Sequence, residues 1–118
     1  MDEKARVEPP VPLCHAAAIG EGEGRGFRLG EGTEQVAVFV VRWQGELRGY
    51  VNSCPHVGTP LDWLPDRFFD RDRALLVCGT HGARFRPGDG VCIAGPCLGT
   101  RLTPAAISVT DGTIVLSQ

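Results

Sequence analysis

Cys-Pro-His-Val-Gly-Thr-Pro-Leu (54–61) and Cys-Gly-Thr-His-Gly-Ala-Arg-Phe (78–85) carry the strongest structural signal in this sequence of 118 residues. Each segment places a histidine two or three residues after a cysteine, and 21 residues separate His56 from Cys78. Thiolate and imidazole are strong ligands for zinc, iron and copper, and one tight turn can present two such donors. The sequence therefore predicts a metal centre held between the two segments. Its candidate ligands are Cys54, His56, Cys78 and His81.

These two segments resemble the cluster-binding loops of Rieske 2Fe–2S proteins. Asp-Gly-Val-Cys-Ile-Ala-Gly-Pro (89–96) resembles the proline-bearing loop that closes over the cluster in that family, so the resemblance spans about residues 50–100. It implies one 2Fe–2S cluster per chain as the cofactor. The cysteines would hold one iron and the histidines the other, and neutral imidazoles raise the reduction potential above that of clusters with four cysteines. The histidine-bound iron lies nearest solvent in the family, so electrons are expected to enter and leave at this end.

The sequence departs from the family pattern at several positions. Gly79 stands where proline is usual, and Thr59 and Thr80 stand where respiratory Rieske proteins carry disulfide-forming cysteines. High-potential members carry a serine and a tyrosine whose hydroxyls donate to sulfur, and Ala83 and Phe85 occupy the matching positions. The resemblance therefore implies a potential near the bottom of the roughly −150 to +300 mV Rieske range.

The composition is that of a strand-and-loop protein, because 16 glycines and 9 prolines imply many turns. No window shows a sustained helical period. Strands are predicted at residues 11–19, 27–29, 35–43, 47–52, 74–77, 91–94, 106–110 and 113–116. The resemblance and these strands together predict an all-β fold, with a Rieske-like antiparallel β-sandwich base and a loop-rich cluster-binding insert. A single Rieske domain is expected over residues 1–118, with a loose tail at 1–10.

The irregular segment at residues 53–90 is too long for an idle loop, and loss of the metal centre is expected to loosen the insert at residues 53–97. Trp63, Phe68 and Phe69 are expected to pin its middle to the domain. Arg84 and Arg86 are either ordinary surface charges or a means of steering an acidic partner.

Three cysteines and one histidine remain outside the predicted ligand set. Cys92 and Cys97 are interpreted as small buried side chains, with a disulfide or redox-sensing pair as the alternative. Cys14 lies in the first predicted strand, and the adjacent His15 is interpreted as a structural or surface residue.

Charge and hydropathy exclude several classes of protein. The formal net charge of −2 gives no basic patch for nucleic acid, and no apolar run approaches the roughly 20 residues of a membrane span. The first ten residues contain no apolar segment of a secretory signal, so a cytoplasmic location is expected.

The function predicted from the sequence is that of a one-electron carrier rather than an enzyme. The chain cannot form a mononuclear iron site with two histidines and a carboxylate, because the cluster would use two of its three histidines. The expected partners are a flavoprotein reductase and a terminal oxygenase or reductase. The alternatives are the small subunit of a reductase such as nitrite reductase, a structural zinc-binding interaction module, and a redox sensor built on Cys92 and Cys97.

Overall fold

The computed structural model describes residues 10–30, 35–55, 58–80 and 82–117 of the chain. Within these ranges the fold consists of strands, turns and one short 3-10 helix, η2 (Ala16–Ala18). The strands are β1 (Val11–His15), β2 (Gly24–Leu29), β3 (Val36–Trp43), β4 (Glu46–Val51), β5 (Leu76–Val77), β6 (Arg84–Phe85), β7 (Cys92–Ala94), β8 (Ile107–Thr110) and β9 (Thr113–Leu116). None of the described residues belongs to a helix with the length and apolar content needed to cross a membrane.

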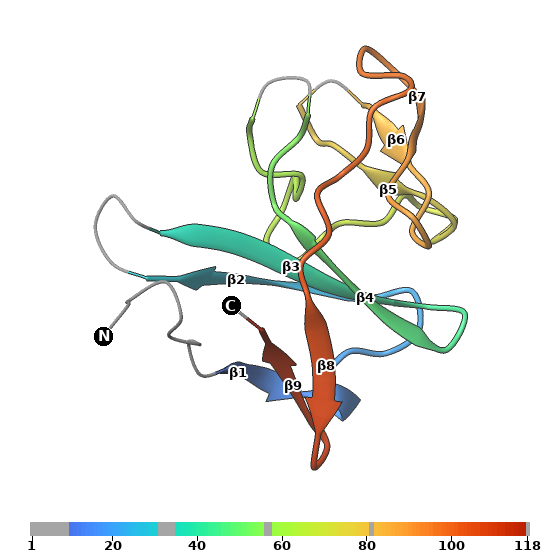
Figure 1. Cartoon of the computed structure of the whole chain (residues 1–118). Helices are drawn as coiled ribbons and strands as arrows, with labels where there is room; N and C mark the ends of the chain where they lie inside the picture. The colour runs from blue at the N-terminus through green and yellow to red at the C-terminus, as the bar shows by residue number, and fades with distance from the viewer. Residues whose placement is uncertain (1–9, 31–34, 56–57, 81, 118) are drawn as a thin grey trace.

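The strands form three antiparallel sheets of three strands each. The orders are β1-β9-β8, β2-β3-β4 and β5-β6-β7. Figure 1 shows the first two sheets as the lower part of the molecule, with the small third sheet and its long loops above them. The prediction of an all-β fold with an antiparallel base and a loop-rich insert is therefore confirmed.

Strand β3 lies at the centre of this arrangement because both of its faces are buried. Successive side chains of a strand point to opposite faces. Phe39 and Val41 belong to a hydrophobic cluster shared with the insert, whereas Val40 packs with Ile19 and Ile114 on the side of the β1-β9-β8 sheet. A continuous apolar run, rather than alternation, is the pattern expected for such a strand.

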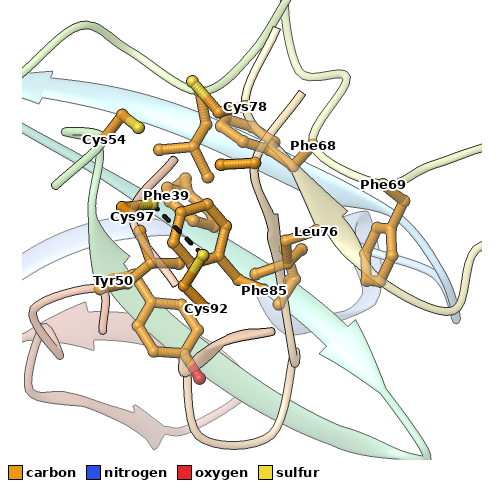
Figure 2. Packing of buried hydrophobic residues seen from close by; sticks show 14 residues of the cluster. Phe39, Tyr50, Cys54, Phe68, Phe69, Leu76, Cys78, Phe85, Cys92 and Cys97 are labelled. Carbon is orange, nitrogen blue, oxygen red and sulfur yellow. Dashed lines mark hydrogen bonds between the residues drawn. The ribbon is translucent and has the colours of Figure 1, made fainter. Parts of the chain in front are cut away.

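The insert has a hydrophobic core in common with the base, so packing as well as the predicted metal centre holds it in place. Phe68 stacks on Phe39 with ring centroids 4.3 Å apart and an interplanar angle of 10°. Leu76 and Phe85, from the small sheet, are fully buried in the same cluster (Figure 2). The buried Tyr50 hydroxyl also donates a hydrogen bond of 2.6 Å to the carbonyl oxygen of Pro87 in the insert.

Two predicted β-hairpins are confirmed. The turn between β3 and β4 has Gln44 and Gly45 at φ angles of 51° and 77°, and the turn between β8 and β9 has Asp111 and Gly112 at 52° and 80°. Two consecutive positive φ angles are typical of the type I′ turns that suit the twist of paired strands.

The first two strands differ from the prediction at their ends. The first stops at His15, where the ring Nδ1 accepts a hydrogen bond from the N–H of Ala17 and caps η2. The second begins earlier than predicted, at Gly24. A Cβ atom at Gly24 would lie 2.9 Å from the ring of Phe68, so this glycine makes room for an aromatic side chain of the insert.

Candidate metal centre

The two cysteine-containing segments fold into loops with the same hydrogen-bonding pattern. In the first loop (54–59), the N–H of Cys54 donates to the carbonyl oxygen of Thr59 at 2.8 Å, and the N–H of Gly58 donates back to that of Cys54 at 2.7 Å. In the second loop (78–83), Cys78 N–H donates to Ala83 at 2.8 Å, and Gly82 N–H donates to Cys78 at 2.9 Å. The sequence spacing of the two motifs thus corresponds to two equivalent turns.

The glycine four residues after each cysteine explains how both loops reverse direction. Gly58 and Gly82 have φ angles of +77° and +73°, in the left-handed region that residues with a Cβ atom adopt at a cost. Glycine at these two positions therefore fixes the same turn in both loops.

Each loop presents a buried cysteine and an exposed tip. Cys54 and Cys78 are 1% and 0% exposed, and Figure 2 shows both at the upper margin of the hydrophobic cluster. Pro55 and Gly58 of the first loop are exposed, as is Thr80 of the second. The cysteine end of each loop is therefore shielded from water, and the described residues Pro55, Gly58 and Thr80 face solvent.

Two hydrogen bonds join the loops directly. The Oγ1 atoms of Thr59 and Thr80 lie 3.0 Å apart. The N–H of Gly79 donates to the carbonyl oxygen of Leu61 at 2.9 Å. The structure thus brings together the two segments that the sequence pattern predicts to share a site.

Gly79, which replaces the usual proline, lies against Trp63. A Cβ atom at position 79 would be 2.4 Å from the Cβ and 2.8 Å from the Cα of Trp63. Any side chain at position 79 would therefore displace the backbone at Trp63. The indole of Trp63 is 52% exposed, so the expectation that it pins the insert is wrong, whereas Phe68 and Phe69 are buried as expected.

Asn52 is a supporting residue that the sequence analysis missed. Its Oδ1 accepts a hydrogen bond of 2.8 Å from the N–H of Leu61, and its Nδ2 donates to Asp62 at 3.2 Å. Because Asn52 directly follows β4 and Leu61 follows the first loop, these bonds hold the two ends of the loop together. The available signal was a polar residue at the end of an apolar strand, two positions before Cys54.

A third loop (95–99) packs on the second. A Cβ atom at Gly95 would lie 2.7 Å from the Cα of Ala83, so the two backbones are in close contact. Cys97 of this loop is buried, and its sulfur lies 3.3 Å from the sulfur of Cys92, which is also buried. Burial raises the pKa of the Cys97 thiol, which also makes a hydrogen bond with Cys54. The prediction of small buried side chains at 92 and 97 is confirmed, and the two are in mutual contact.

The arginines near the second loop each form an ion pair within the insert. Arg84 forms an ion pair of 3.1 Å with Asp70, and Arg86 one of 2.7 Å with Asp89. Hydrogen bonds from the N–H of Val91 and from Arg86 lower the pKa of Asp89. These pairs connect segments within the insert, and their charges are balanced locally.

The donor chemistry fits a centre that prefers sulfur and nitrogen. Two buried cysteines lie on adjoining equivalent loops, and in the chain His56 and His81 fall within the same loops. Both histidines lie outside the described residues. Within the described ranges no group of three or more His, Cys, Asp or Glu side chains is arranged to hold a metal ion.

Comparisons with known proteins identify the family. The model of the Rieske [2Fe-2S] domain matches residues 9–110. The fold is similar to that of the ferredoxin of carbazole 1,9a-dioxygenase from Nocardioides aromaticivorans IC177, with a TM-score of 0.70 and 22% identity over 92% of this chain and 97% of that one. Sphingomonas yanoikuyae B1 ferredoxin gives a TM-score of 0.69 and 22% identity over 93% of this chain and 99% of its own.

A third similar structure is a chain in the reduced complex between oxygenase and ferredoxin in carbazole 1,9a-dioxygenase. Its TM-score is 0.72 and its identity 22%, over 91% of this chain but only 27% of the longer one. No curated protein sequence matches the chain. Because the family model covers residues 9–110, most of its length, the chain belongs to the Rieske [2Fe-2S] domain family, and its cofactor is a 2Fe–2S cluster.

Proposed function

We propose that this protein is a one-electron carrier that receives an electron from a separate reductase and delivers it to a terminal oxygenase. The observation that carries the proposal is the pair of equivalent, adjoining loops that hold Cys54 and Cys78. Two whole ferredoxins also share its fold over almost their full length, 97% and 99%. A chain of this size with one cluster has the character of a mobile carrier.

We assign the cluster ligands as Cys54, His56, Cys78 and His81, with the two cysteines on one iron and the two histidines on the other. The cluster supplies a one-electron couple when bound. The chain's own contribution is to bury the two thiols and to present the loop tips to solvent. The histidines, two or three residues after the buried cysteines, would then lie on the side where a partner approaches.

Shielding one side of the site and exposing the other favours electron transfer over catalysis. On the buried side the two cysteines belong to the same hydrophobic cluster as Phe85 and Leu61. On the other side Pro55, Gly58 and Thr80 are exposed, which suits brief contact with a protein surface.

The family match favours iron over the structural zinc module considered from the ligand types alone. A role as the small subunit of a reductase such as nitrite reductase differs from the proposed function only in the terminal partner. We propose an oxygenase as this partner, because several solved structures with a fold similar to this chain are complexes of an oxygenase with a ferredoxin. We also propose that the chain forms one Rieske domain and acts in the cytoplasm.

Electron counting tests the carrier function. Chemically reduced protein is mixed with a one-electron acceptor such as cytochrome c, and the electrons released per chain are measured over repeated cycles. One electron per chain with full recovery of the visible spectrum is expected. To test the oxygenase assignment, the protein is mixed with the reductase and the oxygenase whose genes lie nearest to its own gene. The amount of product that the oxygenase forms is then measured. A protein that fails to cycle, or that leaves such an oxygenase without electrons, contradicts the corresponding part of the proposal.

A further inference from the structure

Cys92 and Cys97 form a second sulfur site beside the proposed cluster ligands. Their Sγ atoms are 3.3 Å apart, and Figure 2 shows the contact as a dashed line beneath Cys54. Cys92 comes from β7, and Cys97 comes from the third loop. At this distance the Cys97 thiol donates a hydrogen bond to the Cys92 sulfur, so the two sulfurs are direct neighbours, although a disulfide bond measures only about 2.05 Å.

The backbone around the two thiols is closed by hydrogen bonds that do not involve sulfur. The N–H of Cys92 donates to the carbonyl oxygen of Thr100 at 2.8 Å, and the N–H of Gly99 donates to that of Cys92 at 3.2 Å. The two cysteines are thus held on opposite sides of one small closed loop. A bond between their sulfurs requires no rearrangement of the fold.

The loop that carries Cys97 has room to adjust. Gly99 has a φ angle of +89°, and a Cβ atom there would meet nothing within 4 Å. Within residues 93–100, all of which the structure describes, Cys97 is the one buried residue, and its neighbour Leu98 is 67% exposed. A small change in this surface turn is therefore enough to move the Cys97 sulfur toward Cys92.

We propose that Cys92 and Cys97 are an oxidisable dithiol that hydrogen peroxide converts to a disulfide, a two-electron site separate from the one-electron cluster. Cys97, which is 6% exposed against 1% for Cys92, is the more accessible of the two thiols and is assigned the first step. Its sulfur attacks one peroxide oxygen, the O–O bond breaks, and water leaves as a sulfenic acid forms. The Cys92 sulfur then attacks that of Cys97 and displaces a second water molecule. In total, two thiols lose two electrons and two protons, and hydrogen peroxide becomes two water molecules.

Oxidation of Cys92 and Cys97 also changes an interaction with one of the proposed cluster ligands. The thiol hydrogen of Cys97 is donated to Cys92, and the Cys97 sulfur also interacts with Cys54, the first proposed ligand. Forming the disulfide moves the Cys97 sulfur toward Cys92, so its interaction with Cys54 changes whenever the pair is oxidised. Only this coupling rests on the proposed function, because disulfide formation does not depend on which residues hold the cluster.

Peptide mapping of the cluster-loaded protein tests the proposal cleanly. Trypsin cleaves after arginine but not before proline, so one peptide, residues 85–101, contains Cys92 and Cys97 and no other cysteine. The remaining three cysteines fall in the separate peptides 7–25, 49–67 and 74–84. The protein is exposed to hydrogen peroxide at a dose that fully oxidises free glutathione. It is then alkylated in denaturant and digested, and visible absorption measures the cluster content of the same sample.

In the fraction that retains its cluster, peptide 85–101 is expected to be lighter than the dithiol form by two hydrogen atoms and to carry no alkyl group. A thiol reductant reverses the change. Cys97→Ser and Cys97→Ala leave Cys92 open to alkylation, whereas the matched control Cys14→Ser behaves as the unaltered protein. Two alkyl groups on peptide 85–101, sulfinic acid at Cys97 without a bridge, or a bridge found only in protein that has lost its cluster each overturn the proposal.

Discussion

Thr59 Oγ1 lies 3.0 Å from Thr80 Oγ1, so a hydrogen bond between side chains joins the two loops of the metal centre. These are the positions where respiratory Rieske proteins carry disulfide-forming cysteines. In this chain the covalent cross-link is replaced by a hydrogen bond in an exposed setting. Such a bond contributes about 0.5–1.5 kcal/mol, whereas a disulfide typically contributes about 2–4 kcal/mol.

Removing this hydrogen bond is expected to loosen the cluster without unfolding the base. Thr80→Val keeps the size of the side chain but deletes the hydroxyl, so it weakens the join between the loops by about 0.5–1.5 kcal/mol. The rate of cluster loss to an iron chelator rises as a result. Thr80→Ser retains the hydroxyl and serves as the control. Equal rates in the valine and serine variants would show that the hydrogen bond does not hold the loops together.

The stack of Phe68 on Phe39 is expected to stabilise the whole domain, because it joins the insert to the base. Phe68→Ala removes a fully buried ring and should lower the free energy of unfolding by about 3–5 kcal/mol. Trp63→Ala is the matched control, since it removes a larger ring that is 52% exposed and keeps the Cβ that faces Gly79. Denaturant unfolding compares the two. A larger loss for Trp63→Ala contradicts this division between buried and exposed aromatics.

Local sequence signals predicted the base of the fold well. The Asp111-Gly112 turn and the apolar run of β3 are fixed by neighbours in the chain, because turn geometry and strand burial follow from local residue types. The small sheet was harder to predict. Strand β6 has only two residues, and it exists because the chain returns as β5 and β7 on either side of it.

The candidate site likewise has local features that the sequence predicts and long-range features that it does not. The spacing of the cysteines, histidines and glycines within each loop is local, so the motifs were visible in the sequence. The role of Asn52 was not, because it depends on Leu61 returning to the end of β4 after the first loop. The contact between Cys92 and Cys97 was one of two open alternatives, since four intervening residues set no sulfur–sulfur distance.

Tyr50 is expected to make stability fall at alkaline pH. Its burial raises the pKa of the phenol above the ordinary value near 10, because the charged form is disfavoured in the folded state. The contribution of the neutral hydroxyl is therefore complete below pH 10 and is lost as the pH rises through the pKa of the folded state. As Tyr50 is the single tyrosine, ultraviolet titration measures its pKa directly.

Tyr50→Phe isolates this effect. At neutral pH the variant leaves the carbonyl oxygen of Pro87 without its donor and should lose about 1–3 kcal/mol of stability. Above pH 10 the difference in free energy of unfolding between the unaltered protein and the variant becomes smaller. A gap that stays constant over the alkaline range would assign the pH dependence to other groups.

The reduction potential is expected to rise when hydroxyl donors are installed beside the second loop. Ala83 and Phe85 are fully buried and carry no donor. A hydrogen bond to a charged group is worth about 1.5–3 kcal/mol, and about 1.4 kcal/mol corresponds to about 59 mV for one electron. Ala83→Ser and Phe85→Tyr should therefore each raise the potential by tens of millivolts, up to about 130 mV for one hydrogen bond. Voltammetry of an intact cluster whose potential stays unchanged or falls would refute this explanation of a low potential.

The ligand assignment predicts that alanine at Cys54, His56, Cys78 or His81 prevents assembly of the cluster, because each residue would supply one of its four bonds to protein. Iron and acid-labile sulfide are measured in each purified variant. Cys14→Ala, on the opposite side of the base in β1, should keep the full content of both. A variant that retains a full cluster removes the altered residue from the ligand set.

A redox titration of the purified protein, followed by electron paramagnetic resonance and by metal analysis, decides most directly whether the chain carries single electrons. The account predicts a brown protein with two iron atoms per chain, a one-electron transition and a rhombic signal that appears on reduction. A colourless protein with one bound zinc, or an iron protein that takes up no single electron reversibly, would contradict it.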